Sequence, residues 1–411
     1  MVVISINGGK KTVRPDSNRD ICNMRELLKY SVLFIILIIC GTCSEPYTPE
    51  ISKYEDILVI DGIITNEPGP YEVRISRSFK YSDPEGQPEH HATVLIKDDQ
   101  GNIASMEETS PGIYSTIDPD FRGIIGRQYQ LYVNTYPDQQ VYESEFVELK
   151  KVPEIENLYA EFGEKASDTE LEQGFHIYVD TYDPENQTRY YRYDFVETWE
   201  FYVPYPSYYL VESGQLVFRT ERVGDCWKTA NSEDILVTTS ENMQSDIIKR
   251  FPVHFVSTGT NRLSIKYSIL VNQYSMSREA YVFWDQLKAA NQDLGTLFDK
   301  QPAQIRGNIY NVVNPELPVI GFFEASSVDS ERIFIVRSDV PIGTRLTTEF
   351  EYCRYEYIII PKNLYAMYNN KGYCMVLDAS TNEIRFGLGV VATHRCCDCT
   401  LTGSNIRPDF W

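Results

Sequence analysis

Apolar and polar residues alternate along several segments between residues 53 and 151, and this period of two predicts β-strands that bury one face. Residues 71–77 show the alternation clearly, and residues 126–133 repeat it. Residues 98–102 between them contain a glycine in a polar run, which is typical of a hairpin turn. Tyr129 stands near the start of its strand, like the tyrosine corner of immunoglobulin-like sandwiches. We therefore expect an immunoglobulin-like β-sandwich over residues 53–151.

The alternation continues beyond Val152 and Pro153, where we place a domain boundary. Residues 190–199 alternate along their whole length. Four aromatic residues share one face of this predicted strand: Tyr191, Tyr193, Phe195 and Trp199. Residues 152–411 are therefore expected to form a second β-rich domain, which ends in a cysteine-rich C-terminal segment.

One segment has the three- and four-residue spacing of an amphipathic helix instead. Ser277 is a suitable N-cap, and Gly295 stands where a helix commonly ends. The apolar positions between them are Ala280, Trp284, Leu287, Ala290 and Leu294. The pattern predicts a helix over residues 277–294 that covers a sheet face. The expected fold is thus mainly β, with tandem immunoglobulin-like β-sandwich domains and one covering helix.

The longest apolar run, residues 31–40, is too short for a helix that crosses a hydrocarbon core of about 30 Å. The basic residues Arg25 and Lys29 precede it, which is the order found in secretory signal peptides. We expect a signal region over residues 1–42. Translation from Met24 gives the short leader that such a signal needs, so residues 1–23 are interpreted as an upstream over-prediction.

A cysteine directly after the apolar run indicates a lipid anchor. Cys43 follows the small residues Gly41 and Thr42, whereas Cys40 follows the bulky Ile39. We predict lipidation of Cys43, with residues 43–52 as a polar tether to the bilayer. Ordinary cleavage nearby and an uncleaved membrane anchor are the alternatives.

The chain is strongly acidic, with a formal net charge of −21. Residues 1–42 carry six basic and three acidic residues, so the chain without them stands at −24. This charge argues against nucleic acid as a partner, because phosphates repel an acidic surface. The excess serves either solubility or affinity for cationic ligands.

Six of the nine cysteines follow the signal region and the lipid-anchor cysteine, and five of these six lie after residue 350. An even number in an oxidising compartment is typical of disulfides, although six cysteines allow 15 pairings. Zinc binding and free thiols are the alternatives; the tight spacing in the cluster does not match paired zinc motifs. The disulfide candidates are Cys226, Cys353, Cys374, Cys396, Cys397 and Cys399.

Residues 199–209 contain many aromatic rings and two prolines, which stiffen the chain. Exposed rings of this kind bind sugars, peptides or proteins, whereas buried ones pack against a sheet. The candidate contact residues are Trp199, Tyr202, Tyr205, Tyr208 and Tyr209.

Common catalytic motifs are absent from the sequence, including the Walker loop, H-E-x-x-H and G-x-S-x-G. Residues 387–392 match G-x-G-x-x-A but fit a strand better than a dinucleotide site. His90 and His91 are interpreted as an exposed loop pair. The sequence therefore indicates no catalytic residues, no metal site and no cofactor.

Several blocks of the sequence resemble a family of Bacteroidota lipoproteins known as domain of unknown function 4249. The matching blocks are residues 43–49, 58–71, 226–227, 273–284, 295–299, 305–309, 321–326 and 396–411. The resemblance implies a cell-envelope lipoprotein of the kind encoded beside TonB-dependent outer-membrane receptors. It supplies no catalytic residues.

Together these observations predict an outer-membrane lipoprotein, anchored by its acyl chain, that acts as a non-enzymatic accessory or binding component of a TonB-dependent transporter. A surface enzyme acting on carbohydrates or peptides is the first alternative, and a carboxylate pair in one cleft with a raised pKa on one member would favour it. An adhesion or scaffold protein is the second, favoured if no pocket exists.

Overall fold

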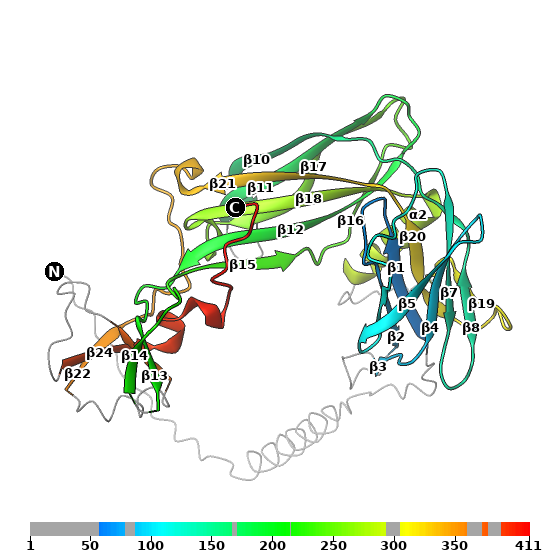
Figure 1. Ribbon diagram of the computed structural model, residues 1–411. Helices are drawn as coiled ribbons and strands as arrows, with labels where there is room; N and C mark the ends of the chain where they lie inside the picture. Colours follow the sequence, from blue (N-terminus) through cyan, green and yellow to red (C-terminus); the bar gives the residue numbers. More distant parts are fainter. Residues whose placement is uncertain are drawn as a thin grey trace, which may run out of the picture. The chain divides into compact units, whose positions relative to one another are not determined.

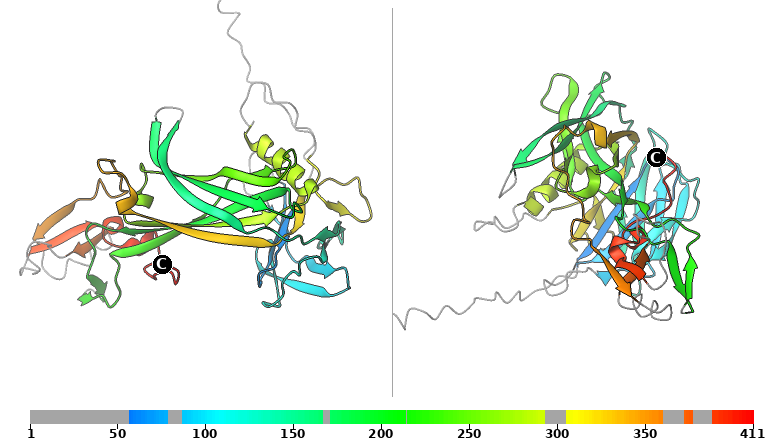
Figure 2. Two further views of the ribbon diagram at one scale, coloured as in Figure 1. Left: turned by 90° about the horizontal axis from the view of Figure 1, so that it is seen from above. Right: turned by 90° about the vertical axis from the view of Figure 1, so that its left-hand side faces the viewer.

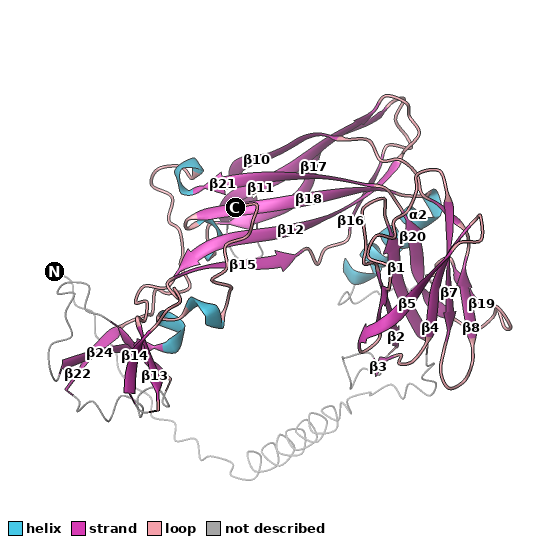
Figure 3. Ribbon diagram, in the orientation of Figure 1, coloured by secondary structure: helices cyan, strands magenta, loops and turns pink. Residues whose placement is uncertain are grey.

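The computed structural model describes residues 57–78, 87–166, 171–213, 215–292, 305–359, 372–376 and 388–411, all within one compact unit, Asp56–Trp411. These residues are mainly β-strand, and the described part contains a single α-helix (Figures 1 and 3). The signal region, Cys43 and the tether up to residue 52 lie outside the described residues, as does Gly295. In the described ranges, no helix is long and apolar enough to cross a membrane.

The first sheet has eleven strands, most of them antiparallel, in the order β19-β8-β7-β4-β5-β6-β2-β1-β20, with β3 beside β2 and β9 beside β7. Its core consists of side chains such as Ile60, Val133 and Phe323. Buried positions alternate with more exposed ones along β1, whereas β20 is buried along almost its whole length. The strands are β1 (Leu58–Ile64), β2 (Glu72–Arg77), β3 (Gln87–Pro88), β4 (Thr93–Asp98), β5 (Ile103–Ser110), β6 (Ile113–Thr116), β7 (Gln128–Asn134), β8 (Val141–Ser144), β9 (Val147–Glu148), β19 (Ile309–Asn311) and β20 (Val319–Ala325).

Two local features of this sheet follow the sequence patterns. The Asp98 carboxylate accepts hydrogen bonds from the backbone N–H groups of Gln100 and Asn102, and Gly101 has φ +88°, so the predicted turn forms between β4 and β5. The Tyr129 hydroxyl accepts a hydrogen bond from the backbone N–H of Ile124 at 2.8 Å. This contact to backbone a few residues upstream is the one that a tyrosine corner makes.

The first sheet is not built from residues 53–151 alone. Strand β20 lies parallel to β1 from Leu58↔Val319 to Ile64↔Ala325, and β19 pairs with β8. The two edges approach each other where the Asn308 side-chain amide hydrogen-bonds to both the N–H and the C=O of Phe323. The strands thus follow one continuous path that curls around its core, and the predicted second domain supplies two of them.

The second region contains two sheets that enclose a common core (Figure 2). One sheet has the order β10-β11-β17, and the other has the order β15-β12-β18-β21 with β16 beside β12. The aromatic face predicted for residues 190–199 points into this core, and Tyr191 and Tyr193 are fully buried there. The strands are β10 (Ile155–Ala166), β11 (Leu171–Asp183), β12 (Tyr190–Tyr202), β15 (Asp225–Asn231), β16 (Leu236–Thr239), β17 (Asp246–Ser257), β18 (Lys266–Ser275) and β21 (Val328–Val336).

The chain crosses between the first sheet and the sandwich at two neighbouring places. Residues 150–152 lead from the first sheet into the sandwich, and residues 326–328 do so again after the chain has returned to the first sheet by way of α2. Lys150 and Ser326 form a parallel bridge, and Ser327 donates its backbone N–H to the Lys150 carbonyl at 3.1 Å. These hydrogen bonds hold the two crossings side by side, although 174 positions separate Val152 from Ser326 in sequence.

Helix α2 (Arg278–Gln292) follows β18 and begins as predicted, because the Ser277 hydroxyl accepts a hydrogen bond from the Ala280 N–H at 3.1 Å. Its apolar side packs on β12, β16 and β20 (Figure 1). Phe283 meets Phe322 of β20 with ring centroids 5.4 Å apart. The helix therefore covers the place where the first sheet and the sandwich meet.

The C-terminal cysteine-rich module is small. It contains the hairpin β13-β14 and the three-stranded sheet β22-β24-β23. Four of the seven residues in its buried core are cysteines. Its strands are β13 (Tyr209–Glu212), β14 (Gln215–Phe218), β22 (Tyr355–Ile359), β23 (Tyr373–Val376) and β24 (Leu388–Thr393). The short 3₁₀ turns among the described residues are η1 (Asn261–Leu263), η2 (Arg337–Asp339), η4 (His394–Cys396) and η5 (Cys399–Leu401).

Candidate ligand-binding site

A polar cavity of about 760 Å³ lies where the first sheet, the sandwich and α2 meet. Strands β1, β2 and β20 line one side, β12 and β18 line another, and residues 231–236 and Trp284 of α2 complete the wall. Its volume is in the range of small-molecule sites, which are concave and carry a few fixed polar groups. Below, these lining residues are called the polar pocket.

The alternation of β12 places charged side chains in this pocket. Tyr191 and Tyr193 face the sandwich core, so Arg192 and Asp194 face the opposite side of the same sheet. Across the ladder, Arg192 pairs with Tyr274 and Asp194 pairs with Asn272, and all four line the cavity. The Asn272 side chain donates a hydrogen bond to Asp194 at 2.7 Å.

Glu324 contributes the most buried charged side chain of the pocket, and it lies in the otherwise apolar strand β20. Its side chain is 5% exposed. Oε1 accepts a hydrogen bond from the Trp284 indole N–H at 2.7 Å, whereas Oε2 is 3.6 Å from Nε of Arg192. That separation is too long for a hydrogen bond, so Oε2 and the Arg192 Nε have no hydrogen-bond partner among the described residues.

Aromatic rings hold the Arg192 guanidinium in place. Its Cζ lies 4.8 Å from the Tyr274 ring centroid and 5.3 Å from that of Trp284, which are cation–π distances. Burial lowers the pKa of Arg192, but the charges of Glu324 and Asp194 outweigh it, and the pKa is raised overall. The arginine therefore stays charged in the wall of the pocket.

Burial raises the pKa of Glu324 above its ordinary value. The charge of Arg192 and the hydrogen bond from Trp284 act in the opposite direction, while Asp61 and Asp194 raise the pKa further. A perturbed carboxyl group in a cavity is a recognised mark of a functional site.

The aromatic contact surface expected over residues 199–209 is only partly exposed. Trp199 was a wrong prediction, because it is 3% exposed and its position on β12 points into the sandwich core. Tyr202 and Tyr208 are exposed, at 56% and 51%. Tyr205 and Tyr209 are half-buried.

The half-buried tyrosines pack against rings of the cysteine-rich module. Tyr205 meets Tyr355 at 5.3 Å between ring centroids, and Tyr209 meets Phe218 at 4.6 Å. Phe218 is 69% exposed and lies in β14, outside the predicted segment. The sequence analysis did not identify Phe218. The signal that could have found it is the pair of short strands, which places Phe218 opposite Tyr209 in a hairpin.

All six candidate cysteines lie in disulfides, which agrees with the interpretation of the sequence. The pairs are Cys226–Cys399, Cys353–Cys396 and Cys374–Cys397. The first joins β15 of the sandwich to the cysteine-rich module, and the other two lie within the module. The bridges therefore fix the module both internally and to the sandwich.

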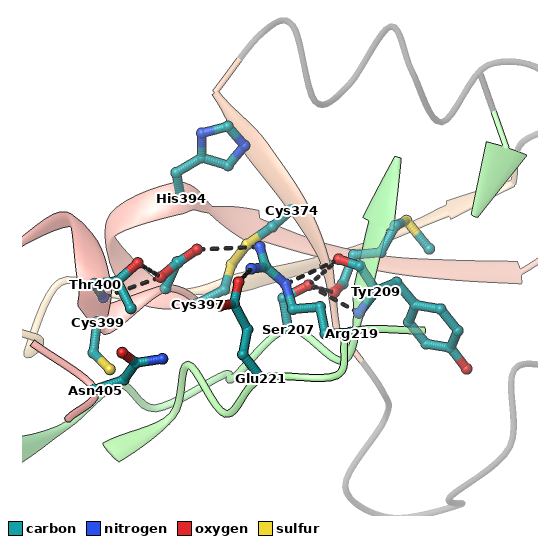
Figure 4. Close-up of polar contacts among 12 residues, drawn as sticks. Ser207, Tyr209, Arg219, Glu221, Cys374, His394, Cys397, Cys399, Thr400 and Asn405 are labelled. Carbon is teal, nitrogen blue, oxygen red and sulfur yellow. Dashed lines mark hydrogen bonds and ion pairs between the residues drawn. A yellow bond between two sulfur atoms is a disulfide. The ribbon is translucent and has the colours of Figure 1, made fainter. Parts of the chain in front are cut away.

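Polar contacts reinforce the module around Arg219 (Figure 4). Its guanidinium lies 3.1 Å from the Asp398 carboxylate and 3.6 Å from that of Glu221. Ser207 donates a hydrogen bond to the Met375 carbonyl at 2.6 Å, which connects the aromatic segment to β23. These groups are engaged with each other, so they serve the structure of the module.

The remaining motifs of the sequence have structural explanations. Strand β24 contains residues 388–392 of the G-x-G-x-x-A match, whereas Gly387 lies outside the described residues. The His90 ring nitrogen lies 2.7 Å from the Glu108 carboxylate on the surface. Across the described ranges, no three His, Cys, Asp or Glu side chains are placed to hold one metal ion.

The fold and the pocket define a β-rich protein with a built polar cavity, and a family model agrees with the resemblance noted in the sequence. The model "Domain of unknown function (DUF4249)" matches residues 44–332. The chain belongs to this family. Every residue of the polar pocket lies inside the matched region, whereas the part of the cysteine-rich module that follows residue 350 lies outside it. No curated protein matches the chain.

Proposed function

We propose that this chain is a lipid-anchored binding protein of the outer membrane, and that it serves a TonB-dependent transporter as a non-enzymatic accessory. The observation that carries the binding role is the polar pocket, where a buried carboxylate and a ring-stacked arginine line a cavity of ligand size. The existence of such a pocket also argues against the alternative of a scaffold protein that works only through flat surfaces.

An enzyme acting on carbohydrates or peptides is the second candidate, because a specific observation favours it. Glu324 has a raised pKa and shares the pocket with Asp61 and Asp194. A general acid, however, must reach the proton acceptor of its substrate. The Oε2 atom of Glu324 is sealed from solvent, and Oε1 is held by Trp284. The geometry therefore supports binding better than turnover.

Incubation of the purified protein with a panel of glycans and peptides separates the two candidates. We expect ligands of the pocket to raise the melting temperature while remaining chemically intact, as judged by mass spectrometry. Turnover that is abolished by Glu324→Gln, but not by Glu145→Gln on the outer surface, would establish the enzyme instead.

The lipid anchor is proposed from residues 24–43 of the sequence. We expect Cys43→Ala to move the protein from the membrane to the soluble fraction and to end labelling by a fatty-acid analogue. Cys40→Ala is the matched control and should leave both unchanged. Continued labelling of the Cys43→Ala protein would contradict the assignment.

The aromatic residues Tyr202, Tyr208 and Phe218 are proposed as the contact surface for the transporter. Their exposure supports this role, since Tyr and Phe give a large contact area at low entropic cost. Replacement of Tyr208 and Phe218 by Ser should weaken capture of a TonB-dependent receptor from detergent-solubilised membranes and leave the melting temperature almost unchanged. Ile103→Ser with Ile342→Ser removes two other exposed apolar side chains and should not affect capture.

The expectation of tandem immunoglobulin-like domains remains a proposal. The hydrogen bond of Tyr129 and the alternation of the strands support it. The first sheet itself follows one continuous strand path, and its arrangement is sandwich- or barrel-like.

A further inference from the structure

The polar pocket carries more negative than positive charge. Six carboxylates and two arginines line it. The carboxylates are Asp61, Glu72, Asp194, Glu233, Asp234 and Glu324, and the arginines are Arg74 and Arg192. A cavity with this balance concentrates cations, because the low-dielectric walls focus the field of the excess carboxylates.

Both arginines already have acidic neighbours. Arg192 faces Glu324, and Arg74 lies 3.7 Å from Glu72 at the exposed rim. Within the described part of the chain, no lysine or arginine forms an ion pair with Asp61, Asp194, Glu233 or Asp234. The carboxylates without an ion-pair partner therefore lie along the pocket wall, on β1, on β12 and at residues 233–234.

A second observation concerns the most buried of these six carboxylates. Glu324 is a nearly fully buried side chain of the wall, and its Oε2 has no hydrogen-bond partner among the described residues. Buried carboxylate oxygens in structural positions are normally satisfied. Because Oε2 is sealed from solvent and Oε1 is held by Trp284, Glu324 contributes its charge to the field of the pocket and leaves direct contact with a ligand to the more exposed carboxylates.

The spacing of the carboxylates distinguishes between kinds of cation. No three acidic side chains in the described segments are close enough together to hold one metal ion. An extended organic cation needs no such convergence, because its charged groups can meet separate carboxylates along the wall. The volume of about 760 Å³ leaves room for a chain of this kind.

We infer that the polar pocket binds an organic polycation through its ammonium or guanidinium groups, with the rim residues Glu233 and Asp234 as the first contacts. This inference rests on the proposed function as a binding protein, and it names the chemical class of the ligand. A free polyamine and a basic peptide both offer ammonium groups, but only the peptide has amide groups in its backbone.

Isothermal titration of the full mature chain, at about 0.15 M salt, tests the inference with spermidine and with trilysine amide as probes. Maltotriose and trialanine serve as neutral probes. We expect spermidine, trilysine amide or both to bind, with affinity that falls as salt is raised. Binding of spermidine alone identifies a polyamine site, and binding of trilysine amide alone identifies a peptide site.

The matched variants separate the pocket from the general acidity of the chain. Glu233→Gln with Asp234→Asn removes two rim charges from exposed positions, so the fold should be unaffected. Glu145→Gln with Glu148→Gln removes the same charge from exposed positions outside the pocket. The first pair should weaken binding of the cationic probe at least about tenfold. The second pair should change it less than about twofold, since screening limits distant charges.

Three outcomes overturn the inference. Equal losses in the two double variants would assign the binding to unspecific surface charge. Absence of binding by either cationic probe at millimolar concentration would exclude the ligand class. Tight binding of maltotriose or trialanine, reduced by Arg192→Ala, would leave the proposed binding function intact and refute only the cationic ligand.

Discussion

Two buried glutamates of this protein, Glu197 and Glu324, occupy contrasting environments. Both residues are at most 4% exposed, and both lie in β-strands beside an arginine and an aromatic side chain. Glu197 belongs to β12 and faces the sandwich core, whereas Glu324 belongs to β20 and faces α2. The comparison separates a carboxylate whose two oxygens are both hydrogen-bonded from one that keeps an oxygen without a hydrogen-bond partner among the described residues.

The Glu197 carboxylate is fully engaged. Arg262 contacts both of its oxygens, with Nε at 2.9 and 3.0 Å and Nη2 at 2.8 Å. The Tyr267 hydroxyl donates at 3.0 Å, and the His254 ring lies 3.5 Å away. Burial acts to raise the pKa of Glu197, but the hydrogen bonds from His254 and Arg262 outweigh it and lower the pKa. Such a network compensates the desolvation of the charge.

The Glu324 carboxylate has one good hydrogen bond, from Trp284, and a loose ion pair with Arg192. Its pKa moves in the opposite direction, because burial is not compensated. The difference teaches that burial alone does not tell a structural charge from a functional one. The degree to which its hydrogen bonds are satisfied does.

The largest expected effect concerns removal of each charge. Glu197→Gln should lower the free energy of unfolding by roughly 3–5 kcal/mol, because it breaks a buried ion pair and leaves Arg262 without its partner. Glu324→Gln should change it by less than about 1 kcal/mol, since the amide oxygen can still accept from Trp284 and the cost of burying a charge is relieved. Urea unfolding at neutral pH measures both. Similar losses of unfolding free energy in the two variants would contradict the distinction between Glu197 and Glu324.

The pH dependence of stability should have opposite signs at the two sites. The pKa of Glu197 is lower in the folded than in the unfolded chain, so its contribution is present above the unfolded value of 4.5 and is lost as pH falls through the folded pKa. The pKa of Glu324 is higher in the folded chain, so its contribution is present below 4.5 and is lost as pH rises through the folded pKa.

Urea titrations of the wild type and the two Gln variants from about pH 3 to pH 7 test these signs. The destabilisation by Glu197→Gln should shrink in acid. The stability of Glu324→Gln relative to the wild type should increase as the pH rises from acid. Parallel curves for the two variants would show that the two carboxyl groups titrate alike.

The smallest expected effect tests how much a single hydrogen bond contributes to the pKa of each carboxyl group. Trp284→Phe removes the only direct hydrogen bond that Glu324 accepts among the described residues and should cost about 1 kcal/mol. It should also raise the pKa of Glu324 further, which carboxyl-carbon NMR can follow. Tyr267→Phe is the matched change at Glu197, and the remaining bonds from Arg262 should keep the pKa of that group low. A pKa of Glu324 that is unchanged by Trp284→Phe would contradict the assigned contact.

Much of the local structure was readable from the sequence. The alternation in residues 190–199 predicted which face of β12 is buried, and Ser277 predicted the start of α2. The turn at residues 98–102 formed as its glycine and aspartate indicated. These features depend on side-chain periods of two or 3.6 and on hydrogen bonds that span a few residues, so neighbouring positions suffice to determine them.

The candidate site was less accessible to the same reasoning. The sequence placed Arg192 and Asp194 on the outer face of a strand, which is the ordinary position of solvated charges. Glu324 gave a signal, since an acidic residue in an apolar strand must find a partner. Trp199 looked like a surface platform but is buried, because its face of β12 meets the opposite sheet.

By itself, the sequence determined that this protein is mainly β, where several of its strands and its helix begin, and that six cysteines, an even number, follow Cys43. Only the tertiary structure decided which cysteines pair, that β20 lies beside β1 from 261 positions away, and that strands of two sheets and one helix line a polar pocket. The physical reason is that these contacts join segments far apart in the chain. Their partners are selected by register, packing and loop closure, which no local pattern specifies.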